Sequence, residues 1–144
     1  MPTIQSKYLG DLRTEATHLQ SGATIITDAP VDNHGRGEAF SPTDLVAAAL
    51  GSCLVTIMGI VAKRDEIDLT GTEFSITKIM SAGLPRKIAK IEVLLTAVSD
   101  RELSESEKAK LEHAARTCPV ALSLNSDIEQ DIQFTWTVSE NILL

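Results

Sequence analysis

The chain has 144 residues, of which 43% are hydrophobic and 23% charged, as expected for one globular domain with a single core. Its formal net charge of −7 repels phosphate backbones and anionic lipid, which argues against nucleic acid or a membrane surface as a partner. The first residues lack the apolar segment of a secretory signal, so we expect a cytoplasmic protein whose two cysteines are free or catalytic.

Residues 3–28 predict three short strands, separated by turns at Gly10-Asp11 and Ser21-Gly22. The next segment, residues 28–40, contains proline, asparagine and two glycines and is predicted to be a loop. Loops of this length in compact domains are often functional.

A long helix is predicted over residues 42–64. Ser41 is a suitable N-cap, Pro42 suits the first helical position, and Asp44 lies near the exposed N–H groups of the first turn. Residues 45–60 carry no charge, so we expect the helix to be buried on every face. Because this apolar stretch is shorter than the ~18 residues expected of a membrane span, we interpret it as a core helix.

The remainder of the chain predicts two strands, a helix and a final strand. Residues 72–80 and 87–98 have the pattern of a hairpin, and Ser104 opens the second helix with a capping box. Residues 128–138 alternate apolar and polar side chains. This order of elements predicts an α+β domain with antiparallel sheet covered by helices.

The two cysteines are the first candidates for chemistry, although a free cysteine is often only a small buried hydrophobe. Cys53 lies in the long helix beside Gly51 and Ser52, whose small side chains leave room for a ligand or a second chain. Cys118 precedes Pro119, which ends the second helix and makes Cys118 the predicted N-cap of a short further turn. This helix-end argument alone makes Cys118 the more acidic thiol.

Other candidates carry weaker signals. The three histidines are scattered and no pair has the spacing of metal ligands, so we expect neither a metal nor a cofactor. Arg36 lies in a Gly-Arg-Gly segment that lacks the Lys-Ser or Lys-Thr of a phosphate-binding loop. Arg13 is either an ordinary surface charge or a partner for a thiolate.

The segment SPTDLVAAALGSC, which ends in Cys53, together with Cys118-Pro119 at a helix end, resembles the OsmC/Ohr superfamily. The DAP…G…SP lead-in is most similar to the general OsmC-like branch. Because the resemblance covers nearly the whole chain, we expect a single OsmC-like domain over residues 1–144. It implies antiparallel sheets packed around a long buried central helix, in an intertwined homodimer with active sites at the subunit interface.

The resemblance also implies a thiol peroxidase that reduces organic hydroperoxides in oxidative stress defence. Cys53 would attack the peroxide and become a sulfenic acid, and Cys118 would condense with it to a disulfide. A dithiol reductant, lipoyl-type or similar, would then restore both thiols. In the family, an arginine about forty residues before the first cysteine stabilises the thiolate, and Arg13 has this separation from Cys53.

One position departs from the family pattern. The well-studied peroxidases have a glutamate directly after the helix-opening proline, whereas this chain has Thr43, which cannot form an ion pair, and Asp44 about 100° further round the helix. Either Asp44 or Glu38 substitutes, or Arg13 is unpaired, or peroxide chemistry is weakened. The alternative functions are binding of a small hydrophobic ligand and redox sensing, both without peroxidase turnover.

Overall fold

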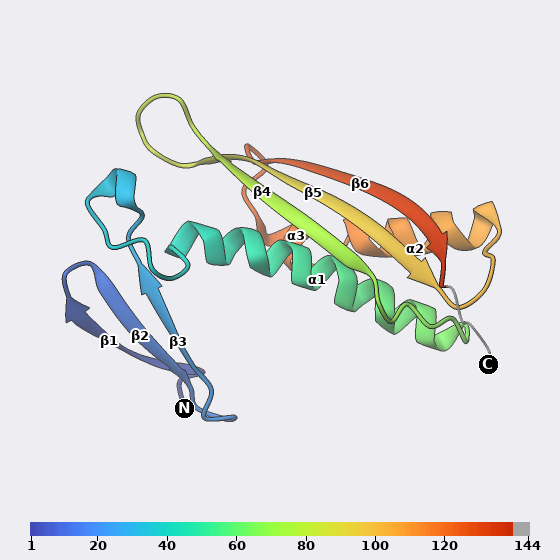
Figure 1. Cartoon of the computed structure of the whole chain (residues 1–144), viewed down its shortest axis with the longest axis horizontal. Coiled ribbons are helices and arrows are strands. Elements are labelled where there is room, and N and C mark those ends of the chain that lie inside the picture. Colours follow the sequence, from blue (N-terminus) through green and yellow to red (C-terminus); the bar gives the residue numbers. More distant parts are fainter. Residues whose placement is uncertain (140–144) are drawn as a thin grey trace. The chain divides into compact units, whose positions relative to one another are not determined.

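The computed structural model describes residues 1–139, which fall into two compact units, Met1–Val46 and a second that begins at Ala47 (Figure 1). The predicted α+β class is confirmed, with two three-stranded sheets. In chain order the elements are β1 (Ile4–Gly10), β2 (Arg13–His18), β3 (Thr24–Asp28), the 3₁₀ turn η1 (Val31–Asn33), α1 (Pro42–Arg64), β4 (Glu73–Met80), β5 (Ile88–Ser99), α2 (Glu105–Arg116), α3 (Pro119–Ser123) and β6 (Glu129–Val138).

The first unit is an antiparallel meander in the order β1-β2-β3, as the turn residues predicted. The turn between β1 and β2 needs the left-handed backbone region, and Gly10 adopts it there at φ 84° without steric cost. The register of β2 and β3 places Arg13 directly opposite Asp28. This pairing brings together two charged side chains from the start of one strand and the end of the next.

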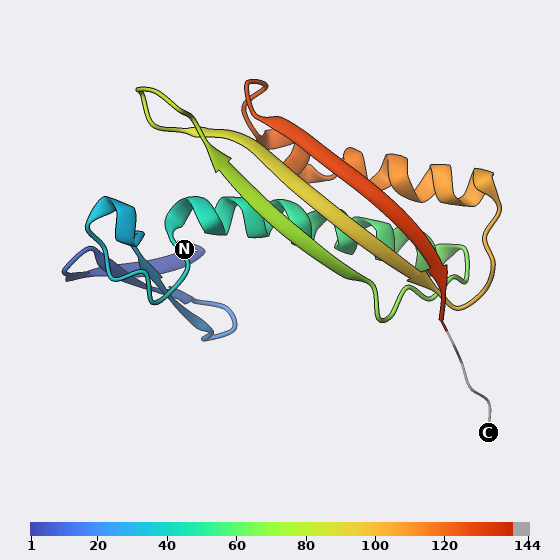
Figure 2. The ribbon, with the colours of Figure 1, turned by 45° about the horizontal axis from the view of Figure 1, so that its top comes forward.

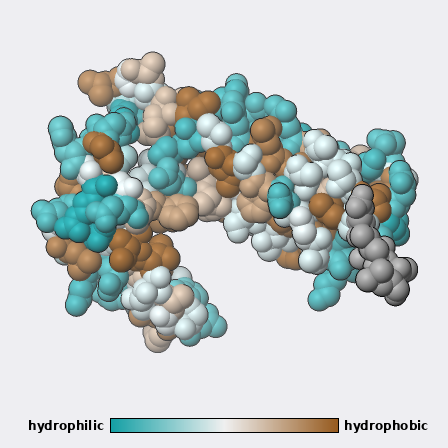
Figure 3. All heavy atoms as spheres, in the orientation of Figure 1, coloured by the Kyte–Doolittle hydropathy of each residue, from teal (hydrophilic) through white to brown (hydrophobic). Residues whose placement is uncertain are grey.

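The first unit has no apolar core of its own. Its only buried residues are Thr27, Asp28 and Ser41. Figure 3 shows hydrophobic residues, coloured brown, at the surface of the molecule. The exposed large apolar side chains of this unit are Met1, Ile4, Tyr8, Leu9, Leu12, Leu19, Ile25, Ile26, Val31 and Phe40. An uncovered sheet of this kind is typical of a surface that another chain buries.

In the second unit, α1, α2 and α3 lie on one face of the β4-β5-β6 sheet (Figures 1 and 2). The core is aliphatic, with Leu50 and Leu54 of α1 and Ile91 and Leu95 of β5 almost fully buried. Gly51 allows close approach of helix and sheet, since a Cβ atom there would collide with the side chain of Ile76 on β4.

One part of the predicted topology is wrong. β4 and β5 are antiparallel, but β6 runs parallel to β5, so this sheet is mixed. The chain between β5 and β6 contains α2 and α3, and a helical crossover of this kind returns the chain to the end of the sheet at which β5 began.

The expectation that the long helix is buried on every face is also wrong for the single chain. The buried positions of α1 form one stripe at helical spacing: Ala47, Leu50, Gly51, Leu54, Met58 and Ala62. Other positions remain open, including Ile60 with 45% exposure. α1 has 23 residues and contains an 18-residue window with a mean hydropathy of 2.3, so it is long and apolar enough to cross a membrane and the length argument from sequence does not hold. Its packing against the sheet favours a core helix.

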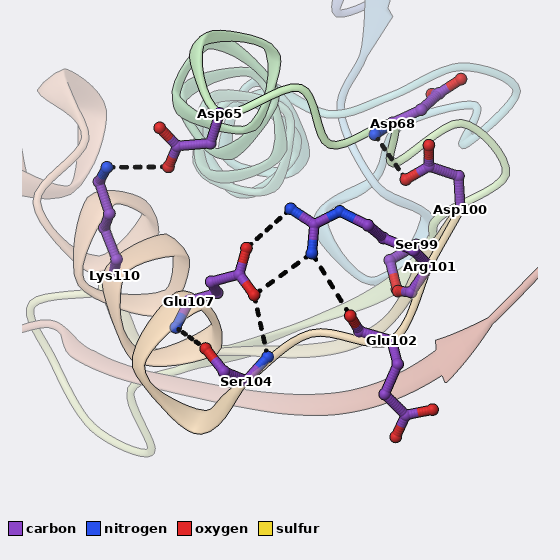
Figure 4. Close-up of polar contacts among 9 residues, drawn as sticks. All are labelled: Asp65, Asp68, Ser99, Asp100, Arg101, Glu102, Ser104, Glu107 and Lys110. Carbon is purple, nitrogen blue, oxygen red and sulfur yellow. Dashed lines mark hydrogen bonds and ion pairs between the residues drawn. The ribbon is translucent and has the colours of Figure 1, made fainter.

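The start of α2 shows how local signals shape this unit (Figure 4). The Ser104 hydroxyl accepts from the Glu107 backbone N–H, and the Glu107 carboxylate accepts from Ser104 N, which confirms the predicted capping box. Arg101 donates to the same carboxylate at 2.8 Å. Further along α2, Lys110 forms a 2.8 Å ion pair with Asp65, just after α1.

Candidate active site

The two cysteines meet within the second unit. Cys53 is half-buried in the middle of α1, and Cys118 is fully buried at the start of α3. The Cys53 side chain lies near enough to that of Cys118 to perturb its pKa, and both thiols are free. The sequence left their proximity open, and the fold brings them together.

Cys118 is held by the turn that joins α2 to α3. It is the N-cap residue, with Pro119 at the first helical position as predicted, and its Sγ accepts from Ala121 N at 3.4 Å. Burial raises the pKa of the Cys118 thiol, and the neighbouring Cys53 raises it further, against the opposing effect of the Ala121 N–H. The helix-end argument for an acidic Cys118 is therefore wrong, because desolvation outweighs the helix-end N–H groups.

Arg13 has a partner that the sequence did not reveal. Its Nε lies 2.7 Å from Asp28 Oδ1 and its Nη2 lies 2.8 Å from Asp28 Oδ2, which is a bidentate ion pair. The Arg13 side chain is 20% exposed and that of Asp28 is 0% exposed. The hydrogen bonds from Arg13 lower the pKa of Asp28 despite the opposing effect of burial, so the buried carboxyl stays ionised.

The other acidic candidates have lesser or different contacts. The Glu38 carboxylate is 68% exposed and lies 3.9 Å from Arg13 Nη2, while its backbone N–H donates to Asp28 Oδ2 at 3.2 Å. Asp44 accepts from Ser41 N at 3.0 Å and caps α1. The Thr43 hydroxyl lies 3.3 Å from the Ser41 hydroxyl.

The candidates therefore fall into two groups. The second unit unites the thiols of Cys53 and Cys118, and the first unites Arg13 with Asp28 and, at its margin, Glu38. Sequence reasoning missed Asp28, although the two predicted turns fix the approximate register of the strands that pair it with Arg13. Within residues 1–139, no three His, Cys, Asp or Glu side chains gather as metal ligands would.

Comparisons with known proteins assign the chain to one family. The model of the OsmC-like protein family matches residues 35–133, more than half of the chain. The crystal structure of an osmotic stress induced and detoxification response protein from Psychrobacter arcticus 273-4 is 48% identical, with 94% of this chain and 96% of that chain covered and a TM-score of 0.88. The chain belongs to the OsmC-like protein family.

More distant structures share the fold. An organic hydroperoxide resistance protein OsmC from Legionella pneumophila is 21% identical over 94% of this chain and 98% of that chain, with a TM-score of 0.67. The organic hydroperoxide resistance protein OhrB of Bacillus subtilis is 17% identical over 92% and 96%, with a TM-score of 0.59. No protein with a curated description matches significantly.

Proposed function

We propose that this protein is a thiol-dependent peroxidase that reduces organic hydroperoxides through Cys53 and Cys118. The observation that carries the proposal is the proximity of a half-buried thiol, Cys53, to a fully buried one, Cys118, on separate elements of one unit. Cys53 is the one that a substrate can reach. Membership of the OsmC-like family, which includes proteins described by organic hydroperoxide resistance, supports the same chemistry.

The reaction proceeds in three balanced steps. The Cys53 thiolate attacks the O–O bond of the hydroperoxide and forms a sulfenic acid, and the alkoxide leaves and takes up a proton to become an alcohol. The Cys118 thiol then condenses with the sulfenic acid, which forms the Cys53–Cys118 disulfide and releases water. A dithiol reductant of the lipoyl type transfers two electrons and two protons, restores both thiols and becomes a disulfide itself.

The active protein is a homodimer in this proposal, and the whole chain acts as one OsmC-like domain. The first unit lacks a buried apolar side chain, and the exposed positions of α1 include Ile60. A second copy that covers these surfaces would bury them and complete an active site at the interface. The reducing cytoplasm would supply the dithiol that regenerates the enzyme.

The decisive experiment measures consumption of cumene hydroperoxide and of hydrogen peroxide by purified protein, with dihydrolipoamide as the reductant. Wild type should turn over repeatedly and prefer the organic peroxide, whereas Cys53→Ser should be inactive. Turnover that persists in Cys53→Ser would overturn the proposal. A wild-type protein that oxidises only once would favour redox sensing, and one whose thiols do not react with peroxide would favour ligand binding.

A further inference from the structure

The second unit contains a pocket that the proposed thiol chemistry does not use. Its volume of about 540 Å³ is in the range of sites that bind small organic molecules. One wall is a row of α1 residues spaced four apart, Val55, Gly59 and Lys63. Residues 66–70, which follow α1, and Asp100, which follows β5, supply the rest of the lining.

Part of this lining is apolar and leaves room for a ligand. Val55 and Leu69 are half-buried, and Ile67 is buried. A Cβ atom added at Gly59 would meet no atom within 4 Å, so the pocket is open down to the backbone of α1. An apolar group placed against these residues would leave water, which favours binding.

The charged part of the lining is mostly acidic, with Glu66, Asp68 and Asp100 against Lys63 alone. Asp68 Oδ1 accepts from the hydroxyl and the N–H of Thr70, at 2.6 Å and 2.9 Å, and these bonds lower the pKa of Asp68. Asp100 Oδ1 accepts from Asp68 N at 3.0 Å (Figure 4), and Asp100 N donates to Asp68 O at 3.1 Å. Within residues 1–139, the Oδ2 atoms of these two aspartates have no hydrogen bond or ion pair.

We propose that this pocket binds an organic ammonium ion with an apolar body. The ammonium group donates to the free carboxylate oxygens of Asp68 and Asp100, since it carries three donors and both acceptors are ionised. The apolar body packs against Val55 and Ile67, over the open backbone at Gly59. The site requires no thiol and no peroxide.

The protein's own cations do not satisfy these carboxylates. Arg101 interacts electrostatically with Asp100, but its side chain donates to the Glu107 carboxylate and to the Glu102 carbonyl. Lys63 contributes one positive charge against three negative ones, so the lining keeps a net negative charge. A ligand that carries a carboxylate or a phosphate would be repelled.

A second copy of the chain is also a poor occupant. Each copy carries a net charge of −7, and burial of the carboxylates of the pocket in a subunit interface would cost their solvation. Ile60, which we assign to the subunit contact, lies about 100° round α1 from Gly59, and Cys53 lies about 120° from it. The pocket is therefore on a different face of the helix from both.

The test uses three compounds that share an indole body and differ in charge: tryptamine is cationic, tryptophol is neutral and indole-3-propionate is anionic. Each is titrated into isotope-labelled protein at neutral pH, and shifts of the backbone amide signals in NMR spectra report both the affinity and the place of binding. Tryptamine should bind on the order of tenfold more tightly than the other two. The largest shifts should fall on residues 55–70 and on Asp100.

Four variants test the roles of the lining residues. Asp68→Asn and Asp100→Asn should each weaken tryptamine binding about threefold to fivefold, as loss of an exposed ion pair does. Lys63→Gln should strengthen it about twofold, because it removes the opposing charge. Gly59→Leu should abolish binding of all three compounds, since the new side chain would occupy the pocket. The control, Asp127→Asn, lies outside the pocket and should change nothing.

Three results would overturn the proposal: equal affinities for the three compounds, no binding of tryptamine to wild type, or unchanged affinity in both aspartate variants. Cys53→Ser separates this site from the proposed peroxidase and should bind tryptamine as wild type does. Weaker binding in that variant, with amide shifts centred on residues 53 and 118, would place the ligand at the thiols and equally refute the assignment.

Discussion

Asp28 on β3 accepts two hydrogen bonds from Arg13 on β2, at 2.7 Å and 2.8 Å, with its own side chain fully shielded from solvent. The two residues are direct partners in the antiparallel register. Arg13 is therefore not an unpaired charge, which was one of the alternatives that the sequence left open.

Cys118→Ser should trap the first intermediate. Without a second thiol in contact with Cys53, the sulfenic acid has no partner for condensation and persists. Mass spectrometry after one equivalent of cumene hydroperoxide should detect a dimedone adduct on Cys53 in this variant and a disulfide in wild type. A disulfide between two copies of Cys53 in the variant, formed faster than the adduct, would contradict the assignment of Cys118 as the resolving thiol.

Ile60→Glu should dissociate the proposed homodimer. Ile60 is 45% exposed on α1, so the change introduces a charge into the covered surface and costs the single chain little. Sedimentation velocity should show a species near the chain mass of 15.5 kDa for the variant and twice that mass for wild type. Leu94→Glu is the matched control, because Leu94 is 51% exposed on the sheet face away from the helices. A dimeric Ile60→Glu protein would place the interface elsewhere.

Gly51→Ala should destabilise the second unit, by about 1–3 kcal/mol, as overpacking of a core does. The added Cβ would collide with Ile76 and approach Phe74, both on β4. Gly59→Ala is the control on the same helix, since no atom lies within 4 Å of the Cβ added there. Urea unfolding at one protein concentration measures both. Equal urea midpoints for Gly51→Ala and wild type would contradict this prediction, because they would mean that β4 accommodates the added methyl group without loss of stability.

Glu107→Gln should make the protein less stable at neutral pH, and the difference from wild type should disappear in acid. Arg101, with help from Ser104 N, lowers the pKa of Glu107 from 4.5 to about 2 (Figure 4). A lowered carboxyl pKa stabilises the fold above the unfolded value and is lost as pH falls through the folded value. Melting temperatures of the two proteins should therefore converge between pH 4.5 and pH 2. A gap that stays constant over this interval would contradict the assignment.

The sequence predicted most of the local structure, because caps and turns depend on neighbouring residues. The capping boxes at Ser41 and Ser104 and the N-cap at Cys118 are all confirmed. The direction of β6 was mispredicted, since alternating side chains look alike in parallel and antiparallel strands. Asp28 was missed because its contact depends on strand register, and a slip of one residue would turn it to the other face.

Composition also could not show which surfaces of α1 the chain covers by itself. An uncharged helix has the same sequence pattern whether its neighbours come from one chain or two. In the single chain, one stripe of α1 faces β4–β6 and positions such as Ile60 stay open. The proximity of the two thiols was equally beyond reasoning from the residues alone, because it depends on how the fold brings the start of α3 near the middle of α1.

The parallel pairing of β6 with β5 has a consequence for synthesis of the protein. β5 is the middle strand of its sheet, yet its second neighbour is made only after α2 and α3. Until residues 129–138 leave the ribosome, β5 presents an unpaired edge beside the apolar side chains of Val93 and Leu95. A chain truncated within the crossover would therefore keep this edge of β5 unpaired and would be prone to aggregate.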